Sequence, residues 1–209
     1  MARLRASDLR RQKKPRALKT RFVLFCEGAN TEPHYFRAVV RLLKLRMVDV
    51  ETVSAAGDPF GIAQKAVKWK SNKGQRVGNL ETYDEGDQVW AVFDRDTHEY
   101  FEAALSLCEK SSINVARSNP CFEVWLILHH EDCHRPLTSH AAQKRLEQLC
   151  PEYDRNASKT VDAAKIIPHI NAAETRAQMH LARRAAEGKP FGPSSTNVHL
   201  LTQALRGRQ

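Results

Sequence analysis

Short apolar segments alternate with helical patterns through the first 118 residues, and this alternation limits the folds available to the chain. Apolar runs occupy residues 22–26, 48–55, 88–93 and 113–117, with helical spacing between successive runs. Such short runs are typical of strands buried on both faces of a sheet. Strands that alternate with helices predict a parallel sheet with right-handed crossovers. We therefore expect an α/β fold with about four mostly parallel strands flanked by helices.

The chain beyond residue 118 contains only helical patterns. We expect helices at 122–128, 139–150, 161–187 with a break near Pro168, and 196–206. Asn119 and Pro120 are a favourable pair for starting the first of them. The predicted organisation is an arm at 1–20, an α/β core at 21–118, and a helical C-terminal part at 119–209 packed on the core.

The positive charge of the chain is concentrated at its N-terminus. Residues 1–21 hold nine Lys or Arg and one acid, Asp8, which accounts for +8 of the net charge of +9. A segment of this composition is typical of a disordered or extended arm that binds a polyanion. A solubilising tail is the alternative. For nucleic-acid contact we single out Arg10, Arg11, Lys13, Lys14, Arg16 and Lys19.

Several classes of protein do not fit the sequence. No stretch approaches the roughly 18 uncharged apolar residues of a membrane-spanning helix. The basic N-terminus lacks the apolar segment of a secretory signal, so we expect a cytoplasmic protein without membrane contact. The five cysteines are irregularly spaced and include no Cys-x-x-Cys pair, which disfavours a disulfide framework and a zinc ribbon.

Acidic residues follow two of the predicted strands. Glu27 comes after the first strand, and Asp94 and Asp96 come after the third. Ligands of open parallel sheets collect at the carboxyl ends of the strands. Asp94 and Asp96 are two residues apart, so an extended chain points both side chains to one side. We expect the three carboxylates to meet at this edge.

Clustered carboxylates repel each other unless a cation lies between them. Oxygen ligands on a partly hydrated site suit Mg²⁺ or Mn²⁺, which bind a few carboxylates together with water and substrate phosphates. The implied chemistry acts on phosphate esters. The alternative is that these acids are ordinary turn formers and helix caps.

Three motifs carry a family resemblance: Cys-Glu-Gly-Ala-Asn-Thr-Glu at 26–32, Val-Phe-Asp-Arg-Asp at 92–96, and Ser-Asn-Pro-Cys-Phe-Glu at 118–123. Over about residues 20–206 the chain resembles RloB-like proteins of the Toprim superfamily. The resemblance implies a Toprim fold, which is Rossmann-like, and Mg²⁺-dependent phosphodiester chemistry similar to that of overcoming-lysogenization-defect nucleases. It also implies a place in bacterial restriction or anti-phage operons, with a possible ATPase partner encoded nearby.

The resemblance assigns roles to particular residues. Glu27 matches the Toprim glutamate, expected to bind metal or act as a general base, and Asp94 with Asp96 matches the metal-binding aspartate pair. Glu32 matches a second glutamate that would hold a second metal, although an acid in a first helical turn is also favoured by the helix dipole. Glu123 would add a further metal ligand. Lys159 resembles a family lysine that would neutralise charge on the scissile phosphate.

Other groupings give weaker predictions. Arg183 and Arg184 are further candidates to neutralise phosphate charge. The histidines at 129, 130 and 134, with Cys133, could bind zinc, but their spacing is irregular, and packing of one histidine under a helix is the alternative. The leading hypothesis is a metal-dependent nuclease. The runner-up is a non-catalytic subunit of a defence ATPase that binds nucleic acid or nucleotide.

Overall fold

The fold is known from a computed structural model, which describes residues 19–55, 57–72, 86–95 and 99–207. The strands are β1 (Thr20–Cys26), β2 (Val48–Ser54), β3 (Gln88–Asp94), β4 (Asn114–Asn119) and β5 (Ser195–Thr196). The helices are α1 (Thr31–Leu42), α2 (Pro59–Ser71), α3 (Phe101–Lys110), α4 (Glu123–Ile127), α5 (Ser139–Leu149), α6 (Ala163–Ile166), the 3₁₀ helix η1 (Ile167–His169), α7 (Ile170–Ala186) and α8 (Val198–Leu205).

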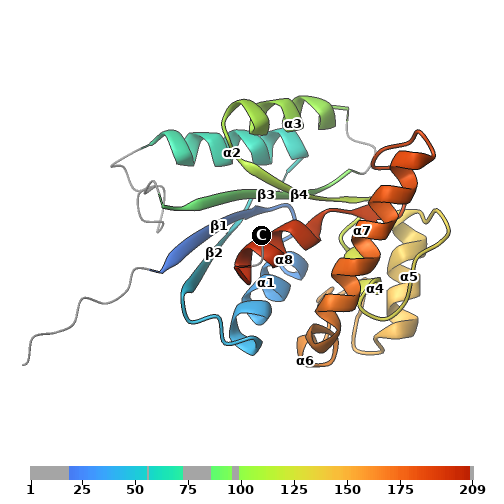
Figure 1. The fold of residues 1–209 in the computed structure, drawn as a ribbon. Coiled ribbons are helices and arrows are strands. Elements are labelled where there is room, and N and C mark those ends of the chain that lie inside the picture. Colours follow the sequence, from blue (N-terminus) through green and yellow to red (C-terminus); the bar gives the residue numbers. More distant parts are fainter. Residues whose placement is uncertain (1–18, 56, 73–85, 96–98, 208–209) are drawn as a thin grey trace, which may run out of the picture.

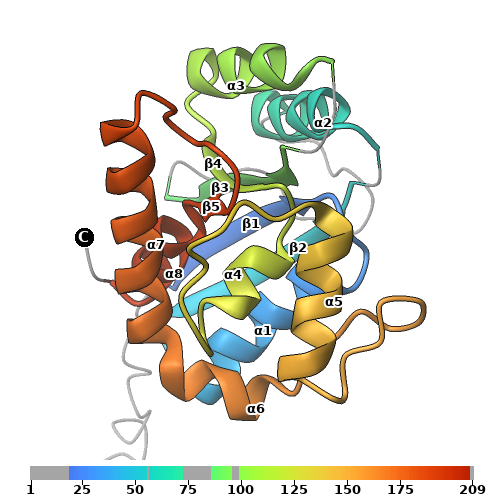
Figure 2. The same ribbon diagram turned by 90° about the vertical axis from the view of Figure 1, so that its right-hand side faces the viewer.

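The five strands form one sheet between two helical layers. The strand order is β2-β1-β3-β4-β5, and only β5 runs antiparallel to its neighbour. Figures 1 and 2 show α2 and α3 on one face of the sheet and the remaining helices on the other. The predicted α/β class with a mostly parallel sheet is therefore confirmed, and the arrangement is Rossmann-like.

Each face of the sheet has its own apolar core, because successive side chains of a strand point to opposite faces. On β1, Leu24 joins the core shared with α1, α4 and α8, whereas Phe25 joins the core under α2 and α3. Trp125 of α4 and Trp69 of α2 are the largest fully buried side chains of the two cores. Because the central strands are buried on both faces of the sheet, their sequences are continuous apolar runs.

The order of the strands reverses at β1. After β1 the chain passes through α1 to β2 on one side, and after α2 it returns to β3 on the other side. β1 and β3 pair in parallel with Cys26 opposite Val92, and the Glu27 N–H donates to the Val92 carbonyl at 3.0 Å. In open α/β sheets, this switch point is where ligands bind at the carboxyl edge.

The C-terminal part contributes a strand that the sequence analysis missed. β5 pairs with the end of β4, and the Ser118 and Thr196 hydroxyls lie 3.0 Å apart in a buried hydrogen bond. Ser195 and Thr196 carry no apolar pattern, so only their pairing partner reveals the strand. The expectation that residues 196–206 are helical holds for α8, which begins at Val198.

One predicted helix start is wrong. Asn119 does not start a helix; it ends β4, and its side-chain amide donates to the Phe191 carbonyl at 2.7 Å. The following helix, α4, begins at Glu123. Elsewhere in the fold, α1 ends at Leu42, and Met47 is exposed in the turn before β2.

The predicted break near Pro168 is confirmed, because Pro168 lies in the 3₁₀ helix η1 between α6 and α7. Asp58 caps α2 by accepting a hydrogen bond from the Gly61 N–H at 3.0 Å. All five cysteines are buried and unpaired. No helix in the described residues has the length and apolar character needed to cross a membrane. Most of the predicted arm, residues 1–18, lies outside the described residues.

The packing of β1 leads to a stability prediction. Leu24→Ala removes a fully buried side chain from the central strand, so the free energy of unfolding should fall by about 3 kcal/mol. Urea unfolding followed by circular dichroism measures this loss. Met179, which is 60% exposed on α7, provides the control, because Met179→Ala should change stability by less than about 0.5 kcal/mol. Equal effects of the two substitutions would contradict the assigned core.

Candidate functional site

A pocket of about 200 Å³ lies at the carboxyl edge of the sheet, next to the switch point between β1 and β3. It gathers side chains from the ends of β1 and β3, the first turn of α1, the start of α4, α5, and the segment before α6. Its lining residues are Glu27, Gly28, Thr31, Glu32, Asp94, Cys121, Phe122, Glu123, Ser139, Gln143 and Lys159. We call this the carboxylate pocket.

Glu27 and Asp94 are joined directly. The Asp94 N–H donates to Glu27 Oε2 at 3.0 Å, so the glutamate side chain reaches across from β1 to the last residue of β3. Both residues are half-buried. This contact places the Glu27 carboxylate beside the last residue of β3, whereas Asp96, the third acid of the prediction, lies outside the described residues.

Glu32 reaches the same pocket from α1. Its carboxylate is buried, and Oε1 accepts a hydrogen bond from the Gly28 N–H at 3.2 Å. Burial raises the pKa of Glu32 to about 7, and the charges of Glu123 and Glu27 add to the increase, while hydrogen bonds from the Glu32 and Gly28 backbone act against it. Glu32 is thus poised to change protonation state near neutral pH.

Glu123 approaches from the opposite wall. It is the first residue of α4, is 5% exposed, and accepts a hydrogen bond from the Tyr153 hydroxyl at 2.5 Å. Burial, then the charges of Glu32, Glu27 and Glu123, raise the pKa of Asp94 well above its usual range; a hydrogen bond from the Phe122 backbone acts in the opposite direction. The four carboxylates therefore interact electrostatically, and ionising all of them together is costly.

This set of donors suits a hard divalent cation in its chemistry, since carboxylate oxygens are the ligands that Mg²⁺ prefers. A cation would also relieve the repulsion that raises the two pKa values. The side chains do not already converge on one point: within the described residues, no three His, Cys, Asp or Glu side chains are placed to hold a metal ion. Glu27, Glu32 and Glu123 instead accept the protein hydrogen bonds described above.

Lys159 supplies a positive charge at the pocket. Its carbonyl accepts a hydrogen bond from the Thr31 hydroxyl at 2.8 Å, and its own N–H donates to the Asp154 carbonyl at 3.0 Å. These bonds fix the backbone of Lys159 beside the first turn of α1, although 128 residues separate it from Thr31. The exposed side chain lines the carboxylate pocket.

The pocket contains five of the predicted site residues: Glu27, Glu32, Asp94, Glu123 and Lys159. Asp96 lies outside the described residues, as do Arg10, Arg11, Lys13, Lys14 and Arg16 of the arm. Lys19 is exposed just before β1, at the amino end of the strand and therefore at the opposite edge of the sheet from the pocket.

The sequence analysis missed three polar residues of the pocket. Thr31 lies within the first motif, but the motif assigns it no role in the site. Ser139 and Gln143 are one turn apart on α5 and line the same pocket. Their spacing places both side chains on one helix face, but nothing in the sequence indicates which surface that face meets.

The histidines suggested for zinc make protein contacts instead. His129 is buried; its Nδ1 lies 3.0 Å from the Trp125 carbonyl and its Nε2 lies 3.0 Å from the Tyr35 hydroxyl. Burial lowers the pKa of His129 to about 3, so the ring is neutral and donates from Nδ1. This arrangement agrees with the alternative that one histidine packs under a helix.

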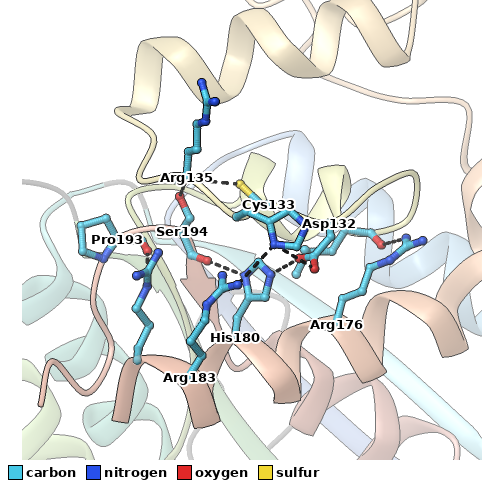
Figure 3. A network of polar contacts seen from close by, with 11 residues as sticks. Asp132, Cys133, Arg135, Arg176, His180, Arg183, Pro193 and Ser194 are labelled. Atoms are coloured by element: carbon cyan, nitrogen blue, oxygen red, sulfur yellow. Dashed lines mark hydrogen bonds and ion pairs between the residues drawn. The ribbon is translucent and has the colours of Figure 1, made fainter. Parts of the chain in front are cut away.

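Arg183 and Arg184 do not line the carboxylate pocket. Figure 3 shows Arg183 in a polar network with His180 and Ser194. Arg184 Nε donates to the Pro193 carbonyl at 3.1 Å, and Arg183 Nη1 lies 3.3 Å from His134. In the same network, the Asp132 carboxylate lies between His134 and the buried His180. The network ties α7 to the segment before β5, so the role suggested for the two arginines at the phosphate is not supported.

Comparison with known proteins identifies the family. A family profile described as "RloB-like protein" matches residues 22–205, which spans the sheet except for the first two residues of β1 and includes every helix from α1 to α8. The chain therefore belongs to the RloB-like family. Searches of the curated proteins and of the solved structures found no match.

The raised pKa of Glu32 predicts a pH-dependent stability. Between about pH 4.5 and 7 the folded protein holds a proton at Glu32 more tightly than the unfolded chain does. The free energy of unfolding should therefore fall as pH rises through this window, by about 3 kcal/mol from this group. Urea unfolding in EDTA at pH 4.5 and pH 7.5 measures the fall, and Glu32→Gln should remove most of it.

Two further variants make this test specific. Glu102→Gln, an exposed change on α3, should keep the wild-type pH dependence. Gly28→Ala should mimic Glu32→Gln, because a Cβ at Gly28 would lie only 2.2 Å from Glu32 Oε2 and must displace that carboxylate. An unchanged pH dependence in Glu32→Gln would show that this side chain is not buried as described.

Proposed function

We propose that the chain is a metal-dependent nuclease that hydrolyses phosphodiester bonds of DNA or RNA. The observation that carries the proposal is the carboxylate pocket itself. Four acidic side chains from separate elements, Glu27, Glu32, Asp94 and Glu123, share a pocket of about 200 Å³ with Lys159 at the switch point of a parallel sheet. A chain tolerates such mutual repulsion chiefly where the charges serve a ligand.

We assign Glu27 and Asp94 as the principal ligands of Mg²⁺ or Mn²⁺, with Glu32 and Glu123 available for the same ion or a second one. Asp96 belongs to the same proposal through its motif. When bound, such an ion lowers the pKa of a water molecule and stabilises charge on the phosphate. Carboxylates with raised pKa values would release their protons as the cation binds.

The hydrolysis requires two further tasks from the chain. The attacking water forms a bond to phosphorus as the bond from phosphorus to the leaving nucleoside oxygen breaks, and the water proton must be accepted while the leaving oxygen gains one from solvent. Glu27 is our candidate for accepting the proton if it does not bind metal directly. Lys159, exposed at the pocket, would neutralise the charge that develops on the phosphate.

The family context supports the same reading. The chain is an RloB-like protein, and its motifs resemble those of Toprim nucleases of the overcoming-lysogenization-defect type. From this resemblance we propose a role in bacterial anti-phage or restriction-linked defence, with an ATPase as a possible partner. The basic N-terminal arm would add attraction for nucleic acid.

The direct test is metal-dependent cleavage. Full-length protein is incubated with panels of DNA and RNA in Mg²⁺, Mn²⁺ or EDTA, and the products are resolved by electrophoresis. We expect cleavage with either metal, none in EDTA, and a loss of at least about 100-fold in Asp94→Asn, because transition-state charge would lose a key stabilising group. Asp49→Asn, an exposed change on β2, should retain wild-type activity.

The outcome separates the two functional hypotheses. Undiminished metal-dependent cleavage in Asp94→Asn would exclude the carboxylate pocket as the active site. Nucleic-acid binding without cleavage in any metal, together with co-purification of an ATPase that survives Glu27→Gln and Asp94→Asn, would favour the non-catalytic subunit instead.

A further inference from the structure

A second hollow, of about 430 Å³, lies beside the carboxylate pocket and has the opposite charge. It is lined by one side of α1 and by the segment around Lys159. The lining residues are Ala29, Asn30, Pro33, His34, Arg37, Ala38, Arg41, Ser158 and Thr160. We call it the α1 groove. Among the residues that the structure describes, no acidic residue lines it, whereas four line the neighbouring pocket.

Three side chains that can donate N–H hydrogen bonds form a row in the α1 groove. His34, Arg37 and Arg41 are spaced three and four residues apart, which places them on one face of α1. The row spans about 10 Å along the helix axis. All three side chains are exposed. Their exposure leaves the two guanidinium charges and the imidazole accessible to a ligand in solvent.

In the described part of the chain, neither Arg37 nor Arg41 has a carboxylate partner. Arg37 donates one N–H to the Thr52 hydroxyl of β2. A guanidinium has five N–H donors, so most remain available for a ligand.

The groove and the carboxylate pocket share a wall. Thr31 and Lys159 both line the pocket, and the Thr31 hydroxyl donates a hydrogen bond to the Lys159 carbonyl. Their chain neighbours Asn30, Ser158 and Thr160 line the groove. A ligand that occupied the pocket and extended past this wall would enter the basic groove directly.

We propose that the α1 groove binds the sugar–phosphate backbone of the substrate strand on one side of the bond held at the carboxylate pocket. The inference rests on the proposed nuclease function and names how its substrate is positioned. A row of N–H donors about 10 Å long that includes two guanidinium groups suits a polymer with regularly repeated phosphates better than a single small anion. Arginine favours phosphate because its planar fork can donate two parallel hydrogen bonds.

The lining also indicates what the groove does not do. Its described lining residues include no aromatic ring on which a base could stack, apart from the imidazole of His34. Contacts to phosphates fix the register of a strand but do not read its sequence. Arg37 and Arg41 are therefore positioning residues, and they should bind different sequences with similar strength.

The test measures binding in the absence of metal, so that it does not depend on cleavage. Fluorescence anisotropy of full-length protein in EDTA follows labelled 20-mers of single-stranded DNA, single-stranded RNA and the corresponding duplexes over a range of salt concentrations. In the double variant Arg37→Ala/Arg41→Ala we expect about 10-fold weaker binding or more. The negative slope of log affinity against log salt should become shallower by about 2, one unit for each lost phosphate contact.

Two controls distinguish the groove from a general effect of charge. Lys110→Ala removes an exposed positive charge from α3, on the opposite face of the sheet, and should leave affinity and slope nearly unchanged. Arg37→Lys/Arg41→Lys should retain most of the salt slope while binding more weakly than wild type. Circular dichroism should be unaltered in every variant, because both arginines are exposed.

The results separate this inference from the nuclease proposal. Weaker binding and a smaller slope in the double alanine variant support the α1 groove, even if the protein cleaves nothing. Unchanged binding in that variant, an equal loss in Lys110→Ala, or no binding of wild type to any of the probes would overturn it, even if cleavage is observed. The DNA and RNA arms identify which polymer the groove takes.

Discussion

Parallel pairing of β1 with β3 is the constraint on which the rest of this structure depends. It sets Cys26 opposite Val92 and brings Glu27 to the end of β3, where its carboxylate accepts the Asp94 N–H at 3.0 Å. Both strands are buried on both faces, so their register is strongly specified by packing. The position of the acids is therefore a consequence of the hydrophobic core, and the chain has little freedom to separate them.

The clustering of these carboxylates lowers the stability of the folded protein and favours the binding of a cation. Glu32 and Asp94 have raised pKa values because they are removed from water and lie near other carboxylates. The Gly28 N–H stabilises Glu32, the Tyr153 hydroxyl stabilises Glu123, and the Asp94 N–H donates to Glu27. The proposed cation would add a positive charge among these carboxylates, and protein stability and metal binding would then be coupled.

α1 serves both functional surfaces. Its first turn sends Glu32 into the carboxylate pocket, while His34, Arg37 and Arg41 line the groove on its exposed side. A helical period of 3.6 residues lets one helix carry an inward acid and an outward basic row without conflict. The hydrogen bond from Thr31 to Lys159 then ties the helical part of the chain to this turn. In the proposed function, one helix would thus orient both the metal ligands and the substrate strand.

The sequence by itself determined the α/β class, the parallel strands and the meeting of Glu27 with Asp94, because each follows from local apolar patterns and the rule for carboxyl edges. Tertiary structure alone decided the rest. β5 depends on pairing with β4, and Lys159 reaches the pocket through a contact across 128 residues. In the sequence, the exposed arginines of α1 resemble an ordinary solvated helix face. The fold places Ser158 and Thr160 beside them, and together these residues line a groove. Contacts between distant segments leave no periodic signal in the chain, so only the folded arrangement reveals them.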